Sequence, residues 1–163
     1  MPVGPDLVQT KRWLPHWQQG GATYFVTFRT LSIELPSTLR RDVLTALRYF
    51  DDDRYKLWAA IVMPDHAHLL LTPLEQRPGH WWSLSSILHS LKAYTSKQIN
   101  RGLNRQGTVW MQESFDRIVR DEAELLEKWQ YLRNNPVRRE LCAAPEEWDA
   151  LYERAEDRPR RTG

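Results

Sequence analysis

The sequence has very little cysteine, since Cys142 is the only one among its 163 residues. One thiol cannot form a disulfide framework within the chain, and it cannot supply a zinc site built on several cysteines. Long apolar runs are also missing, because no stretch approaches the roughly 18 residues that a membrane-spanning helix requires. Residues 1–10 hold no apolar segment of the kind found in secretory signals. These absences lead us to expect a cytoplasmic protein that does not enter a membrane.

The net charge is small, because 23 Lys and Arg residues face 21 Asp and Glu residues. The charge is nevertheless uneven: seven basic residues and only two acidic ones, Glu113 and Asp116, lie between Arg77 and Arg120. This segment could bind phosphate, and it could equally be the solvated face of a helix. The eight Trp residues leave a similar choice, between core packing and stacking on unpaired bases.

The length fits one compact domain. Residues 1–20 carry three prolines and two glycines, which predicts an irregular N-terminal arm. The domain itself should span residues 21–155, and the polar residues 156–163 should form a flexible tail.

Hydrophobic periodicity predicts an α+β fold. The expected strands are 23–29, 55–63, 66–72 and one within 109–119; the expected helices are 36–50, 83–100, 122–133 and a short one at 146–154. Residues 76–79 read as a loop, and helix 122–133 should stop before Pro136. The order β-α-β-β-α-β, followed by a helix, is the ferredoxin-like split βαβ arrangement, an antiparallel sheet with helices packed on it.

His66 and His68 are two residues apart on a predicted strand. Side chains alternate along a strand, so both imidazoles should face the same side and could bind one metal ion. They could also be ordinary half-buried histidines, and a metal would need a third ligand. His16, His80 and His89 show no such pattern and are interpreted as structural or incidental.

A second candidate cluster lies on the predicted helix 83–100. Tyr94 and Gln98 are spaced i and i+4, so they are neighbours on the helix surface. The Gln98 carbonyl could complete a metal site, and the Tyr94 phenol could attack phosphorus with help from a metal or a base. Alternatively, Tyr94 simply packs on the sheet and exposes its hydroxyl.

Motifs across roughly residues 12–141 occur in an order that matches a known family. The pieces are Leu14–Trp17, Gly21–Arg29, Met63–Leu70 with its His-hydrophobic-His strand, Leu91–Thr95, Val109-Trp110, Phe115–Arg117, Val119–Asp121, Tyr131, Asn134–Arg138 and Leu141. In this order they resemble the REP-associated tyrosine transposases, relatives of the IS200/IS605 single-strand transposases. The chain departs from that family at Asp65, where Asn is usual, and the family varies at the position of Gln98.

The resemblance implies an enzyme that nicks and rejoins single-stranded DNA near a hairpin or a repeated palindrome. It implies a bacterial, nucleoid-associated protein, acting as a monomer or homodimer. His66, His68 and Gln98 would hold Mg²⁺ or Mn²⁺, and Tyr94 would form a 5′-phosphotyrosine. The side chains expected to contact DNA are Lys92, Lys97, Arg101, Arg117, Arg120 and Trp110.

Two other functions fit parts of the pattern. One is a domesticated DNA-binding protein on the same fold without catalysis, for which Asp65 is the only supporting feature. The other is a small phosphoesterase with a histidine nucleophile, which is disfavoured because Leu70 stands where a third histidine would be expected.

Overall fold

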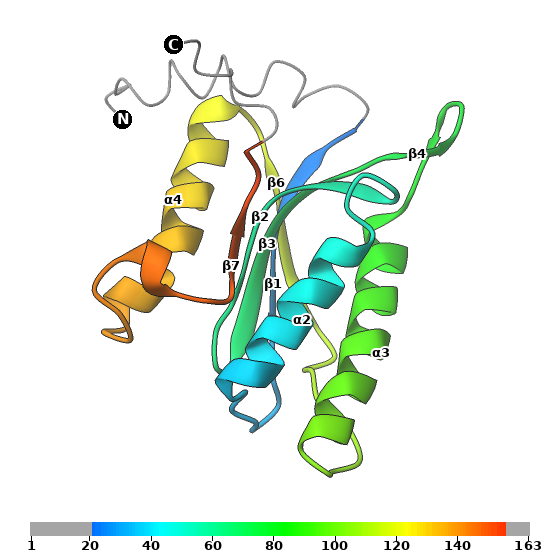
Figure 1. Ribbon diagram of the computed structural model, residues 1–163. Helices are drawn as coiled ribbons and strands as arrows, with labels where there is room; N and C mark the ends of the chain where they lie inside the picture. The colour runs from blue at the N-terminus through cyan, green and yellow to red at the C-terminus, as the bar shows by residue number, and fades with distance from the viewer. Residues whose placement is uncertain (1–20, 156–163) are drawn as a thin grey trace.

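The computed structural model describes residues 21–155, so the expected arm and tail lie outside the described residues. The strands are β1 (Thr23–Arg29), β2 (Tyr55–Val62), β3 (His66–Pro73), β4 (Glu75–Arg77), β5 (His80–Trp81), β6 (Phe115–Val119) and β7 (Leu151–Glu153). The helices are α2 (Ser37–Tyr49), α3 (Leu84–Gly102) and α4 (Glu122–Arg138), with a 3-10 turn at Pro145–Glu147. Figure 1 shows their arrangement.

The main sheet has the strand order β6-β1-β3-β2-β7, and every neighbouring pair is antiparallel. The strands β6, β1, β3 and β2 are adjacent in the order expected for the ferredoxin-like arrangement, so the predicted fold class is confirmed. Of the predicted loop at 76–79, only residues 78–79 form a turn, at the tip of a small separate hairpin, β4-β5; Gln76 and Arg77 belong to β4. The predicted fourth strand within 109–119 is β6, and an isolated bridge joins Trp110 to Thr30.

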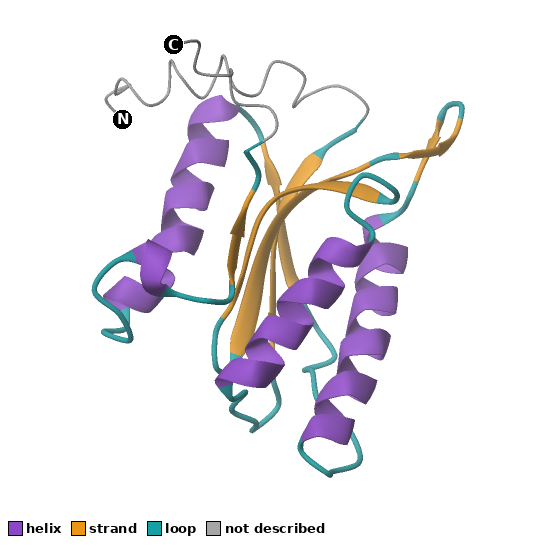
Figure 2. Cartoon of the chain, in the orientation of Figure 1, coloured by secondary structure: helices purple, strands orange, loops and turns teal. Residues whose placement is uncertain are grey.

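Helices cover both faces of the sheet: α2 and α3 lie on one face and α4 on the other (Figure 2). Alternation along β3 decides which side chains meet which helices. Ala67, Leu69 and Leu71 pack in one cluster with apolar side chains of α2 and α3. Leu70 packs in a second cluster with apolar side chains of α4. His66 and His68 share the face of Leu70 and therefore point toward α4.

The start of α4 follows from its sequence. The Asp121 carboxylate accepts a hydrogen bond from the Glu124 amide at 2.8 Å and caps the helix. Glu122 and Glu124 place negative charge in the first turn, which the helix dipole favours.

The predicted end of this helix before Pro136 is wrong, because α4 continues to Arg138. Proline removes one intrahelical N–H donor, but Pro136 is buried and lies in the last turn, where packing outweighs that loss. Beyond it, the Arg139 amide still donates to the Asn135 carbonyl. Asn135 therefore belongs to the helix, and its side chain points from α4 toward His66 and His68 on the sheet.

The predicted short helix at 146–154 is also wrong, since only Pro145–Glu147 is helical and Leu151–Glu153 pairs with β2 as an edge strand. Long-range contacts favour the strand. The Glu153 carboxylate accepts from Trp129 Nε1 at 2.7 Å, and the Arg154 guanidinium pairs with Asp51 at 3.0 Å. Trp129 and Asp51 are too distant in the sequence for hydrophobic periodicity within 146–154 to indicate these contacts.

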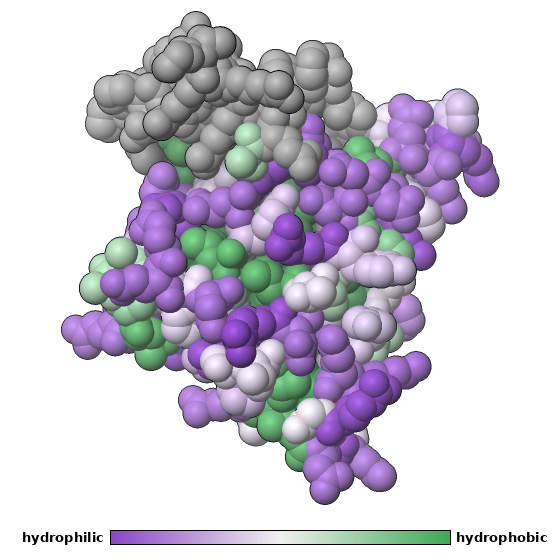
Figure 3. Space-filling view, viewed as in Figure 1, coloured by the Kyte–Doolittle hydropathy of each residue, from purple (hydrophilic) through white to green (hydrophobic). Residues whose placement is uncertain are grey.

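The face seen in Figure 3 is mostly hydrophilic, with apolar groups between the elements. This fits helices that turn their apolar sides to the sheet. None of the helices in residues 21–155 combines the length and the apolar content that a membrane crossing requires.

Candidate active site

Two histidines meet on the α4 face of the sheet. His66 and His68 are both buried, and their ring centroids lie 4.7 Å apart. The strand supplies a rigid base, since β3 is hydrogen-bonded to β1 on one side and to β2 on the other.

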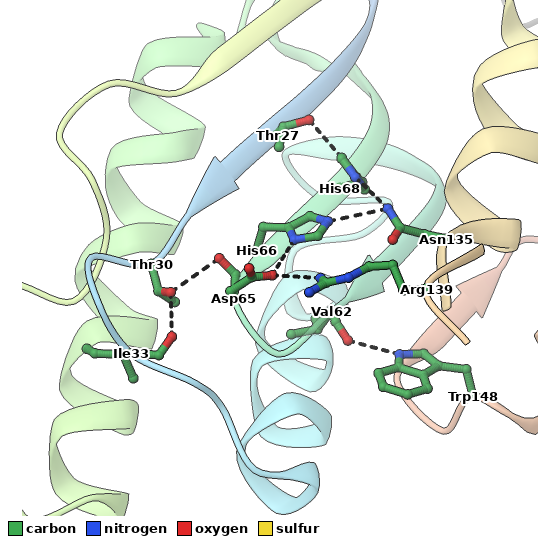
Figure 4. Close-up of polar contacts among 10 residues, drawn as sticks. All are labelled: Thr27, Thr30, Ile33, Val62, Asp65, His66, His68, Asn135, Arg139 and Trp148. Atoms are coloured by element: carbon green, nitrogen blue, oxygen red, sulfur yellow. Dashed lines mark hydrogen bonds and ion pairs between the residues drawn. The ribbon is translucent and has the colours of Figure 1, made fainter. Parts of the chain in front are cut away.

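A third side chain reaches this pair from α4. Figure 4 shows the Asn135 side chain pointing at both imidazoles. Its Nδ2 lies 3.3 Å from His66 Nε2 and 3.0 Å from His68 Nε2. One amide nitrogen carries two hydrogens, so it can donate one to each imidazole. The Nε2 atoms of both histidines therefore converge on one buried amide.

The hydrogen bonds on the far side of each ring fix where the imidazole protons lie. The Asp65 carboxylate, 2.7 Å from His66 Nδ1, can only accept, so His66 carries its proton on Nδ1. His68 Nε2 accepts from Asn135, so His68 Nδ1 donates to Thr27 Oγ1 at 2.7 Å. Both Nε2 lone pairs are thus directed at the same point, which is the state a metal ligand needs.

Electrostatics keep both imidazoles neutral. Burial lowers the pKa of His66, an effect that the hydrogen bond to Asp65 partly offsets. Burial, with His66 and the cationic Arg29 nearby, lowers the pKa of His68 to about 3. Burial alone would raise the pKa of Asp65, but hydrogen bonds from His66 and from Arg139 at 2.9 Å outweigh it and hold that pKa below its ordinary value.

The donor set fits a divalent cation. No group of three His, Cys, Asp or Glu side chains suited to a metal occurs within residues 21–155, so a metal site built on His66 and His68 would draw its third protein ligand from another residue type. Asn135 is placed to serve, because turning its side-chain amide would present the oxygen where the nitrogen now lies. Imidazole nitrogens with a carbonyl oxygen, leaving positions for water and substrate oxygens, suit an ion such as Mn²⁺.

A tyrosine lies beside this cluster on the same helix. Tyr131 is one turn before Asn135, and its ring centroid is 5.7 Å from that of His68. The ring also packs edge-on against Phe25, and the Arg138 guanidinium lies 4.2 Å from its centroid. With 47% of the residue exposed, Tyr131 is open to a large substrate.

The structure does not bring Tyr94 and Gln98 to the histidines of the same chain, so the roles predicted for them stay predictions. Both residues belong to α3, on the opposite face of the sheet from His66 and His68. Tyr94 is 60% exposed there. Gln98 Oε1 is buried and has no hydrogen-bond partner in the described part of the chain. The sheet therefore separates the predicted nucleophile and third ligand from the histidine pair of the same chain.

Sequence reasoning missed Asn135 and assigned no chemistry to Tyr131, although a signal was present. Tyr131 and Asn135 have the same i, i+4 spacing as Tyr94 and Gln98, and both lie among the last motif pieces of the family resemblance, Tyr131 and Asn134–Arg138. Ending the helix before Pro136 left Asn135 in a loop and hid the spacing.

The predicted DNA-contacting cations are spread over both faces. Lys97 and Arg101 lie exposed on α3, away from the histidines. Lys92 Nζ donates to the carbonyls of Met111 and Gln112 at 3.0 and 3.4 Å, and burial lowers its pKa. It therefore anchors the segment before β6.

On the α4 side, Arg117 and Arg120 share one carboxylate. Arg117 Nε lies 3.0 Å from Glu124 Oε1, and Arg120 Nε lies 3.8 Å from Glu124 Oε2. That pairing offsets part of their charge. Contact of these cations with DNA stays a prediction.

Trp110, the predicted stacking platform, belongs to the core instead. It is only 4% exposed, packs edge-on against Phe28 and donates from Nε1 to Thr95 Oγ1 at 2.9 Å. Bases cannot stack on a ring in this position.

We expect Trp110→Phe to lower the free energy of unfolding by about 1–3 kcal/mol, because it removes buried atoms and a buried hydrogen bond. Urea unfolding measures this loss, and affinity for single-stranded DNA should stay unchanged. Lost DNA affinity with unchanged stability would restore the stacking role.

Asp65 should act on metal binding through His66. We expect Asp65→Ala to weaken Mn²⁺ binding by about tenfold, because His66 loses the acceptor that orients its ring. Asp65→Asn keeps an acceptor oxygen and should bind Mn²⁺ more tightly than Asp65→Ala. Isothermal titration calorimetry measures both affinities, and an Asp65→Ala affinity equal to the wild type would contradict this role.

Comparison with known proteins supports the resemblance noted in the motifs. No protein-family profile matches the chain. A Haemophilus influenzae protein named as a REP-associated tyrosine transposase is 24% identical over 99 residues, covering 55% of this chain and 54% of that protein. The chain thus matches about half the length of this curated relative.

Two solved structures match this chain in the structural comparison, one of them above a TM-score of 0.5. A REP-associated tyrosine transposase bound to a REP hairpin matches at a TM-score of 0.58 and 19% identity, over 79% of this chain and 74% of the other. A Deinococcus radiodurans R1 protein described as a transposase matches at a TM-score of 0.42 and 20% identity, over 69% and 88% of the two chains. In sequence and in fold, this chain is similar to the REP-associated tyrosine transposases.

Proposed function

We propose that this protein nicks and rejoins single-stranded DNA, with Tyr131 as nucleophile and with His66, His68 and Asn135 as the ligands of a divalent cation. The observation that carries the proposal is the convergence of both Nε2 atoms on the Asn135 amide, one helical turn from Tyr131. The similarity to a transposase whose structure holds a REP hairpin supports hairpin DNA as the substrate.

The reaction transfers the scissile phosphate from a 3′ oxygen of the DNA to the Tyr131 oxygen. The Tyr131 hydroxyl oxygen attacks the scissile phosphorus, and the bond from phosphorus to the 3′ oxygen of the preceding nucleotide breaks. The phenol loses its proton to solvent, and the departing oxygen gains one. The products are a 5′-phosphotyrosine and a free 3′-hydroxyl. One phosphoester bond replaces another, so attack of the 3′-hydroxyl on the phosphotyrosine can rejoin the strand without ATP.

The chain supplies cations around the point of attack. Arg29 is exposed next to the histidines and has no acidic partner within residues 21–155, so its charge is available for a phosphate. The Arg138 guanidinium lies 4.2 Å from the Tyr131 ring centroid, so a second cation is next to the attacking residue. Arginine suits this task because its planar fork matches phosphate oxygens.

A bound cation would contribute Lewis-acid stabilisation of charge on the phosphate oxygens. The role of His66, His68 and Asn135 is to hold it beside Tyr131, and the role of Asp65 and Thr27 is to keep both imidazoles in the ligating tautomer. All of these residues belong to one chain, so the proposed constellation does not need a second copy.

An adduct assay tests the proposal. End-labelled hairpin DNA with single-stranded flanks, taken from the sequence around the gene, is mixed with the protein in Mn²⁺ or in EDTA and run on a denaturing gel. We expect a protein-linked band with Mn²⁺ and none with EDTA, together with a shortened strand ending in a 3′-hydroxyl. Retarded DNA on a native gel with no adduct in any metal would contradict catalysis and favour the non-catalytic DNA-binding protein.

A further inference from the structure

A cavity of about 770 Å³ opens beside the candidate active site, between β1, β6 and α4. This volume lies in the range of small-molecule sites, about 300–1,000 Å³. The residues that matter for its chemistry are Phe25, Arg29, Met111, Phe115, Lys128 and Tyr131. His68 also lines it, so the cavity is continuous with the histidine cluster.

The walls of this cavity are unusually apolar for an exposed surface. Phe115 is 61% exposed, and Met111 and Tyr131 are exposed as well, although large apolar side chains are normally buried. Phe25 forms a buried floor and stacks on His68 at a centroid distance of 5.2 Å. Such side chains gathered around one hollow mark a binding site rather than a core.

Strand register places Phe115 in line with the histidines. Phe115 is paired with Thr27 across β6 and β1, and Thr27 is paired with His68 across β1 and β3. Directly opposed residues in an antiparallel pair share a face, so Phe115 lies on the α4 side, two strand spacings or roughly 10 Å from His68. A group stacked on Phe115 would therefore be adjacent to whatever binds at the histidines.

Charge at the cavity selects the kind of ligand. Arg29 and Lys128 both line it, and Lys128 Nζ lies 5.7 Å from the Phe25 ring centroid. Glu113 is the only acidic side chain in the lining. An aromatic wall next to cations is the combination that binds a base through its face and the adjoining backbone through its phosphate.

We propose that this cavity holds one unpaired nucleobase of the single-stranded substrate, stacked on Phe115 and adjacent to the phosphate that Tyr131 attacks. The inference rests on the proposed function, and it adds the position that the flanking nucleotide takes. Stacking uses the face of the ring that every base has, so the cavity should accept all four bases.

The same strand offers a matched control. Ile118 is also large, apolar and 54% exposed, but it is paired with Tyr24, which packs on the α2 and α3 side. Phe115→Ala and Ile118→Ala therefore remove similar exposed groups from one edge strand, on opposite faces of the sheet. Both variants should fold, because neither side chain is buried.

The test measures affinity without chemistry. A fluorescent DNA hairpin with single-stranded thymidine extensions on both ends is titrated with the full-length protein in EDTA, and binding is followed by anisotropy. A second series replaces each extension nucleotide in turn by an abasic residue. Wild type, Phe115→Ala, Phe115→Trp and Ile118→Ala are compared.

We expect Phe115→Ala to weaken binding about tenfold, with Phe115→Trp close to wild type and Ile118→Ala within about twofold. One abasic position should weaken the wild type by a similar factor and have no further effect in Phe115→Ala. Equal affinities of wild type and Phe115→Ala, or an abasic penalty of the same size in both, would overturn the base site.

The two proposals fail in different ways. If the Mn²⁺-dependent adduct forms but the abasic penalty does not depend on Phe115, the catalytic proposal stands and the base site falls. If the penalty depends on Phe115 but no adduct forms, the base site stands and catalysis falls. A wild type that binds no single-stranded DNA overturns both.

Discussion

Tyr131→Phe should reduce formation of the covalent adduct by about three orders of magnitude or more, because the ring remains but the attacking oxygen is gone. The Tyr131 hydroxyl has no hydrogen-bond partner within residues 21–155, and the ring contacts with His68 and Phe25 survive the substitution. Stability should therefore change by no more than about 0.5 kcal/mol. A quantified denaturing gel with Mn²⁺ measures the adduct, and thermal unfolding checks the fold.

Tyr94→Phe is the matched control for this experiment. Tyr94 is a helical tyrosine with a similar exposed fraction, but it lies on the α3 side of the sheet. Its adduct yield should equal that of the wild type. Loss of the adduct in Tyr94→Phe with retention in Tyr131→Phe would reverse the assignment, and would require α3 of a second copy to reach the histidines.

Asn135→Ala should weaken Mn²⁺ binding by at least about tenfold, because it removes the side chain that faces both Nε2 atoms. The substitution also leaves two buried acceptors without a donor, which should lower the free energy of unfolding by about 1–3 kcal/mol. Isothermal titration calorimetry measures the Mn²⁺ affinity at a temperature where the variant is folded.

Two further variants separate ligand loss from misfolding. Asn134→Ala, on the adjacent residue of α4, should bind Mn²⁺ as the wild type does. Asn135→Asp keeps an oxygen at the ligand position and should restore most of the affinity lost in Asn135→Ala. Equal Mn²⁺ affinity in Asn135→Ala and the wild type would exclude Asn135 as a ligand.

Periodicity predicted most of the fold because its elements are locally determined. The β-branched and aromatic residues of β1 and the Leu and Val spacing of α2 each specify an element without reference to the rest of the chain. The segments that failed depend on distant partners. Leu151–Glu153 is a strand because it pairs with the outer edge of β2, and α4 passes Pro136 because Asn135 and Pro136 in its last turn are buried.

The candidate site was harder to predict because it depends on which face of the sheet each helix covers. His66 and His68 were recognisable from their spacing on one strand. The sequence could not decide whether Tyr94 or Tyr131 is the nucleophile, since both have an amide side chain four residues later. Only the placement of α3 and α4 on opposite faces separates them.

The most direct test of the central claim is to identify the tyrosine that carries the nucleotide. The adduct formed with Mn²⁺ is treated with nuclease and trypsin, and the peptides are sequenced by mass spectrometry. Cleavage after Lys128 and Arg133 releases residues 129–133 with Tyr131, and cleavage after Lys92 and Lys97 releases residues 93–97 with Tyr94. We predict a nucleotide on the peptide 129–133, whereas a nucleotide on the peptide 93–97 would contradict the site proposed from this structure.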